Sequence, residues 1–200
     1  PKLNIYAIPF VPNHTSGLDM FTPLPQQSNL IAGKIIPHAN INYNPSADIS
    51  TQNLLVEIRK KNHKRVIFGN LNINSIRNKI EMLSPLIKDK IDIFLVCETK
   101  INDSFPTAQF LIPGFSPPFR LDRTSMGGGL LLYTRADIPS KSLDCHYCKN
   151  IECMPIELCI AKKKWLVYGI DNPSKSQMQN HLSSLVKSLD KFTSLYNRSF

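Results

Sequence analysis

The chain has 200 residues, a net charge of +9 and an apolar fraction of 42%, which is enough for a hydrophobic core. The positive charge favours a polyanionic partner, and both nucleic acid and an anionic membrane surface fit it. No run approaches the roughly eighteen apolar residues of a membrane span, and the N-terminus has no signal-peptide pattern. The five cysteines, an odd number, favour reduced thiols in an intracellular compartment.

The first 50 residues are broken up by prolines and rich in asparagine, serine and glutamine. They sustain no strand or helix period, which predicts an irregular N-terminal arm or linker over residues 1–50. Within this arm, Leu3–Phe10 can form a short strand. The chain begins with Pro1 rather than methionine, so we expect it to be a fragment. Residues 51–200 are expected to form the N-terminal portion of a larger folded domain.

Two helices and two strands are predicted next in the chain. An apolar stripe with basic residues in its last turn predicts a helix over Thr51–Lys61. Val66–Asn74 predicts a buried strand, and a helix capped by Ser75 or the residue before it should follow and be kinked or ended early by Pro85. Apart from Asp92 near its start, Ile91–Cys97 is apolar at both odd and even positions, which is typical of a central strand covered on both faces. This order predicts a layered α/β arrangement.

The stretch after the second strand is rich in loops, with a short strand expected near Gln109–Ile112. Gly128–Arg135 predicts another strand. Glu152–Ile160 alternates between apolar and other residues, and with Trp165–Ile170 it predicts a hairpin closed by a lysine-rich turn. A helical apolar stripe predicts a long helix over Gln177–Tyr196.

Polar side chains follow both buried strands. Asn72 and Asn74 lie at the end of the first strand, and Glu98 follows the second. Carboxylate and amide oxygens can hold Mg²⁺ together with water, and the ion can polarise a phosphodiester. On spacing alone, the alternative is that these side chains only make turns. Gly127–Gly129 is similarly open, as a flexible turn or as a place where a DNA backbone approaches closely.

Four short motifs in a fixed order carry a resemblance to a known family. They are LNINSIRNK at Leu71–Lys79, ETK at Glu98–Lys100, FRLDR at Phe119–Arg123 and GGG at Gly127–Gly129. With similar intervals, these motifs resemble the endonuclease domain of non-LTR retrotransposon polyproteins, a member of the endonuclease/exonuclease/phosphatase family that includes exonuclease III and apurinic/apyrimidinic endonucleases. The resemblance covers roughly residues 60 to 200. It implies a four-layer α/β sandwich, with two mixed sheets face to face and helices outside.

The resemblance also implies roles for single residues. Asn72 matches the family's first active-site asparagine, which helps to position metal or phosphate, and Glu98 matches its metal-binding glutamate. Asn74 stands where repair enzymes often carry aspartate, and we expect it to contact DNA. Arg120 and Arg123 are expected near the DNA backbone, where arginine forks suit phosphates.

Two departures from the family pattern stand out. Asp171, ahead of Pro173, occupies the position where the family carries a tyrosine that contacts the scissile phosphate. The family's Gly-Asp-x-Asn and Ser-Asp-His motifs, which orient water and leaving group and contact the phosphate, do not occur in the sequence. We therefore expect an incomplete domain that is inactive, or nearly so, by itself.

The resemblance implies an intact domain that nicks target DNA with Mg²⁺, or Mn²⁺ as an alternative, and leaves a 3′-hydroxyl. A downstream reverse transcriptase domain of the parent polyprotein would extend that end. The expected partner is DNA and not a membrane, and the expected location is intracellular, or nuclear if chromosomal DNA is the target. The alternative is a degenerate, non-catalytic relic that still binds nucleic acid. A phosphatase of the same fold is a third, weaker interpretation.

Overall fold

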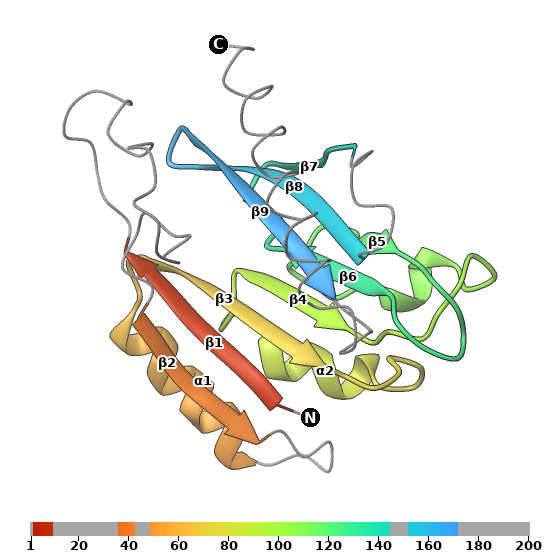
Figure 1. The fold of residues 1–200 in the computed structure, drawn as a ribbon. Coiled ribbons are helices and arrows are strands. Elements are labelled where there is room, and N and C mark those ends of the chain that lie inside the picture. Colours follow the sequence, from red (N-terminus) through yellow and green to blue (C-terminus); the bar gives the residue numbers. More distant parts are fainter. Residues whose placement is uncertain (1, 10–35, 43–48, 145–151, 172–200) are drawn as a thin grey trace, which may run out of the picture.

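The computed structural model describes residues 2–9, 36–42, 49–144 and 152–171, which form two β-sheets with few helices (Figure 1). The helices are α1 (Ile49–Lys61), α2 (Ile80–Ile87) and a short 3₁₀-helix at Thr107–Phe110. The strands are β1 (Lys2–Pro9), β2 (Ile36–Asn42), β3 (Arg65–Asn72), β4 (Ile93–Cys97), β5 (Phe119–Leu121), β6 (Leu130–Thr134), β7 (Ser140–Ser142), β8 (Glu152–Ile160) and β9 (Lys163–Asp171). In these segments, no helix is long and apolar enough to cross a membrane.

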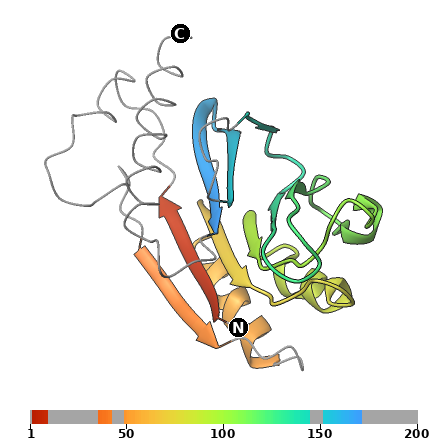
Figure 2. The same ribbon diagram turned by 45° about the vertical axis from the view of Figure 1, so that its right-hand side comes forward.

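The larger sheet has six strands in the order β2-β1-β3-β4-β6-β5, and the smaller has three in the order β7-β8-β9. Among the strands that the structure describes, only β3 and β4 pair in parallel, joined by α2 as the crossover that a parallel pair requires. Helices α1 and α2 lie against one face of the larger sheet and the smaller sheet lies against the other (Figures 1 and 2). The described chain is therefore a mixed α/β structure with three layers.

Strand β4 shows why the chain needs both layers. Phe94 and Val96 pack among the helices, whereas Ile93 and Cys97 pack against the smaller sheet. The predicted central strand with two covered faces is confirmed. The predicted hairpin is also confirmed, because β8 and β9 pair around a turn at Ala161–Lys162 and the alternating residues of β8 enter the core between the sheets. The helix predicted over Gln177–Tyr196 lies outside the described residues.

The N-terminal region contributes two strands to the larger sheet. Strand β1 confirms the strand expected around Leu3–Phe10 and pairs with β3 in antiparallel register. Strand β2 pairs with β1 and was not predicted. An irregular conformation over residues 1–50 is therefore wrong for these two segments. The pairing of β1 with β3, and of β2 with β1, supplies the order that the polar, proline-broken sequence does not indicate.

The local predictions for α2 and for the segment near Gln109–Ile112 are corrected. Helix α2 begins at Ile80 rather than near Ser75, because the backbone is left-handed at Asn74, Ser75 and Asn78 and cannot join a right-handed helix there. Pro85 does not end α2 early, since the helix continues to Ile87. The strand expected near Gln109–Ile112 is wrong: the chain forms the 3₁₀-helix instead, and its last carbonyl accepts a buried bond from the Tyr133 hydroxyl at 2.9 Å.

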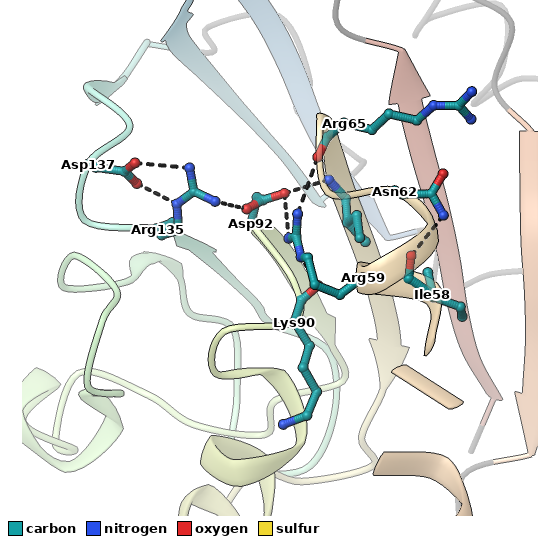
Figure 3. A network of polar contacts seen from close by, with 9 residues as sticks. Ile58, Arg59, Asn62, Arg65, Lys90, Asp92, Arg135 and Asp137 are labelled. Carbon is teal, nitrogen blue, oxygen red and sulfur yellow. Dashed lines mark hydrogen bonds and ion pairs between the residues drawn. The ribbon is translucent and has the colours of Figure 1, made fainter. Parts of the chain in front are cut away.

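A buried carboxylate fixes the end of β4 that lies away from Glu98. Asp92 accepts the backbone N–H of Ile67 at 2.7 Å and forms ion pairs with Arg59, at 2.7 Å, and with Arg135 (Figure 3). Arg135 also binds the carboxylate of Asp137 at the surface. These contacts tie α1, β3 and the loop after β6 to the start of β4.

Candidate functional site

The predicted site residues meet where the parallel strands β3 and β4 end. Asn72 closes β3 and stands opposite Cys97 in the ladder, so Glu98 follows beside it. The two outgoing loops then bind each other: the N–H groups of Ile73 and Ser75 donate to the carbonyls of Cys97 and Glu98 at 3.0 and 2.7 Å. The edge at which Asn72, Asn74 and Glu98 gather is the carboxyl end of a parallel pair, where α/β sheets commonly bind ligands.

The backbone at this edge is unusual. Asn74, Ser75, Glu98 and Lys100 all have positive φ, between +48° and +77°. Asparagine tolerates this left-handed region, but serine, glutamate and lysine adopt it at a cost. Such conformations persist where the surrounding contacts impose them, and they cluster at functional sites.

Glu98 uses one of its carboxylate oxygens inside the protein. Its Oε2 accepts the N–H of Gly128 at 3.0 Å, and no bond to the other oxygen is recorded within the described segments. Asn72 turns its Oδ1 back to the N–H of Asn74 at 3.2 Å, which makes the short turn that the simpler interpretation predicts. Glu98 therefore keeps one oxygen for a cation, whereas the amide oxygen of Asn72 is already engaged.

Two lysines converge on the loop that carries Asn74. Lys100 Nζ donates to Asn74 Oδ1 at 2.5 Å, and Lys79 Nζ donates to the carbonyls of Ile73 and Asn74 at 2.8 and 3.0 Å. Burial lowers the pKa of Lys79, and the nearby positive charge of Lys100 lowers it further. The loop is therefore flanked by positive charge that could meet a phosphate.

The two predicted arginines have different surroundings. All five N–H donors of Arg120 are used within the chain, on Asp122, on Thr107 and on the carbonyls of Phe105 and Asn102. This pattern gives Arg120 a structural role in holding the loop after Glu98, and it leaves no donor for the DNA contact that was predicted. Arg123 lies at the site itself, where one nitrogen binds Glu152 Oε1 at 3.0 Å.

Glu152 is a residue of this edge that the sequence interpretation missed. It begins β8, and its Oε2 accepts the N–H of Gly129 at 2.7 Å. Burial raises its pKa, while the bonds from Gly129 and Arg123 act in the opposite direction. The hairpin register could have revealed it, because a two-residue turn at Ala161–Lys162 places Glu152 opposite Asp171.

The pKa of the Cys97 thiol shows that Asp171, Glu152 and Glu98 all lie near this side chain. Burial, followed by the negative charges of Asp171, Glu152 and Glu98, raises the pKa of its thiol to about 12. The thiol therefore stays protonated at neutral pH and is poorly suited to nucleophilic attack or metal binding. Even so, no three His, Cys, Asp or Glu side chains in the described ranges are arranged to hold a metal ion.

The donor set at this edge fits Mg²⁺ only in part. Mg²⁺ commonly binds proteins through one or two carboxylates and keeps water and substrate phosphate as its other ligands. Glu98 can supply one such oxygen. In comparisons with known proteins, no family model matches the chain and no curated protein matches it.

Proposed function

We propose that this chain is the N-terminal part of a metal-dependent DNA endonuclease domain of a non-LTR retroelement, with the four-layer endonuclease/exonuclease/phosphatase sandwich. The observation that carries the proposal is the meeting of Asn72, Glu98 and the glycine turn at one sheet edge. Motifs that resemble the family in their order along the chain thus also lie together at one edge of the sheet. The net charge of +9 suits a nucleic acid partner.

In this proposal each residue has a distinct task. Glu98 holds Mg²⁺, or Mn²⁺, through its unshared oxygen, and the cation supplies charge stabilisation at the phosphodiester. Asn72 orients the loop that faces the phosphate by binding the N–H of Asn74. Arg123 lies at the rim, where its guanidinium can meet the DNA backbone. In the parent protein, the nick would prime a downstream reverse transcriptase domain, in the nucleus where chromosomal DNA is the target.

We also propose that the 200-residue chain does not complete the reaction. The groups that orient water and leaving group in the family belong to Gly-Asp-x-Asn and Ser-Asp-His motifs, and neither motif occurs in this sequence. Asp171 brings a carboxylate to the position of a phosphate-binding tyrosine, and its charge would repel the phosphate. One metal ligand without these partners gives little transition-state stabilisation.

The test is nicking of supercoiled plasmid DNA in the presence of Mg²⁺. We expect no nicking by the 200-residue chain, and Mg²⁺-dependent nicking once a family C-terminal segment with both motifs is fused after Phe200. Glu98→Gln should reduce that nicking by at least about 100-fold, because it removes the metal-binding charge. Clear nicking by the unfused chain, or fused activity that survives Glu98→Gln, would contradict the proposal.

The second candidate is a nucleic-acid-binding relic without catalysis. It is favoured by Asp171 and by the missing Gly-Asp-x-Asn and Ser-Asp-His motifs, since the groups that would act on the phosphate are lost while the net charge of +9 remains. The fused chain separates the two candidates. A relic would bind DNA with a strong dependence on salt yet leave the plasmid intact, even after Asp171→Tyr restores the family side chain.

A further inference from the structure

Met126 is the most exposed of the large apolar side chains in the described segments. Its exposed fraction is 85%, compared with 48% for Leu111 and 42% for Leu54. A single exposed apolar residue is common on protein surfaces and by itself indicates nothing. Met126 differs in its position, because it lies at the tip of the Thr124–Gly127 turn, two residues before the glycine that binds Glu98.

The turn that carries Met126 is pinned internally. Thr124 and Gly127 form an isolated antiparallel bridge. The Thr124 hydroxyl accepts the N–H groups of Met126 and Gly127 at 3.3 and 3.2 Å and donates to the carbonyl of Gly127 at 3.2 Å. The tip therefore has a defined backbone, and Met126 is not among the side chains that pack into either core of the described residues.

The base of the turn, at Gly128 and Gly129, is hydrogen-bonded to residues from both sheets. Gly128 and Gly129 donate to the carboxylates of Glu98 and Glu152, and their carbonyls accept the N–H groups of Lys100 and Thr99 at 3.0 and 3.2 Å. The position of Met126 is therefore fixed relative to Glu98. A side chain held in water on a rigid support has little freedom to find a partner within its own chain.

Two arginines lie near this apolar tip, and both also make contacts within the chain. Arg77 donates to the carbonyl of Ser125 at 3.4 Å while its guanidinium stacks on Phe105, 4.9 Å from the ring centre. Arg123 lies beside Gly128 at the base. An apolar tip between positive groups is complementary to a polyanion with apolar surface between its charges, and duplex DNA has this character in its grooves.

We propose that Met126 is a DNA-contacting residue that packs against the sugar and base edges of duplex DNA next to the Glu98 site. This inference rests on the proposed function. The thioether chain is flexible and polarisable, so it adapts to irregular apolar surface. The contact adds affinity that depends on apolar burial and not on phosphate charge.

The test compares the affinity of four chains for a fluorescently labelled DNA duplex over a range of salt concentrations. They are the unaltered chain, Met126→Ala, Met126→Leu and, as a matched control on an apolar residue outside the turn, Leu111→Ala. Met126→Ala should weaken binding by about tenfold, with an unchanged slope of log Kd against log salt, because no phosphate contact is lost. Met126→Leu and Leu111→Ala should stay within about twofold of the unaltered chain. Thermal melting should be the same for the unaltered chain and Met126→Ala.

The outcomes separate this inference from the proposed function. Salt-dependent binding that Met126→Ala leaves unchanged would overturn the role of Met126 and leave the nuclease proposal standing. A weaker Met126→Ala complex with a shallower salt slope would also overturn it, since the loss would then be electrostatic. No DNA binding by the unaltered chain would overturn both.

Discussion

Asp92→Asn should destabilise the fold strongly, although it changes one atom far from the Glu98 edge. The Asp92 side chain is only 2% exposed, and it meets two arginines and the N–H of Ile67. Asparagine keeps the acceptor for Ile67 but presents an amide donor to a guanidinium donor. Arg59 and Arg135 then lose their shared carboxylate, although Arg135 keeps its pair with Asp137.

The magnitude follows from the burial of the partners. Removing one member of a fully buried pair costs about 3–5 kcal/mol. Here Arg59 is 20% and Arg135 44% exposed, so water recovers part of the loss. We therefore expect the free energy of unfolding to fall by about 2–4 kcal/mol, a large part of the stability of a typical domain.

The assay is equilibrium unfolding in urea, followed by circular dichroism at neutral pH. Asp137→Asn is the matched control, because Asp137 binds the same Arg135 but is 65% exposed. An exposed pair contributes about 0.2–1 kcal/mol, so the control should change little. If both variants lost the same small amount, the idea that Asp92 joins the helix layer to the sheet would be refuted.

Three further changes test the glycine turn and its neighbours, each by urea unfolding. Gly129→Ala should lower the free energy of unfolding by about 1–3 kcal/mol more than the control Gly114→Ala. Both glycines have φ near +88°, but of the two only Gly129 would bring a Cβ against a side chain, Thr99 Oγ1 at 2.4 Å. Thr99→Val should be neutral or stabilising, since the buried hydroxyl has no recorded partner; a loss above about 1 kcal/mol would contradict this. Burial raises the pKa of Glu152, so its stabilising contribution is present below the unfolded pKa and declines as pH rises through the folded value. The stability of the unaltered chain relative to Glu152→Gln should therefore fall as the pH rises above about 4.5, the ordinary pKa of glutamate, and a rise would refute the sign.

Strong periodicity predicted the elements whose side chains face a core. Ile93–Cys97 and the β8–β9 hairpin follow from apolar patterning that the packing requires. Strand β2 did not follow, because its order comes from pairing with β1, a contact distant in sequence. The start of α2 was missed for a different reason: the loops after β3 and β4 bind each other and impose left-handed residues where a cap was expected.

The sequence predicted the candidate site only to the extent that it predicted where strands end. Asn72 and Glu98 come together because parallel neighbours end at the same edge. Glu152 could have been inferred only by extending the hairpin register from its turn to its open end. The contacts of Arg120 within the chain could not have been inferred, because they depend on carbonyls of a loop that has no sequence signature.

The contacts of Glu98 also bear on how it could hold a cation. Because Gly128 occupies Oε2, Glu98 offers a single oxygen, and Glu152, which also binds the glycine turn, is committed to Gly129 and Arg123. A cation bound by one carboxylate oxygen and water is held weakly until phosphate oxygens complete its shell. Under the proposed function, we therefore expect a metal ion to bind this edge only together with DNA. The described residues hold no group of three or more metal-binding side chains, which agrees with weak binding of the metal alone.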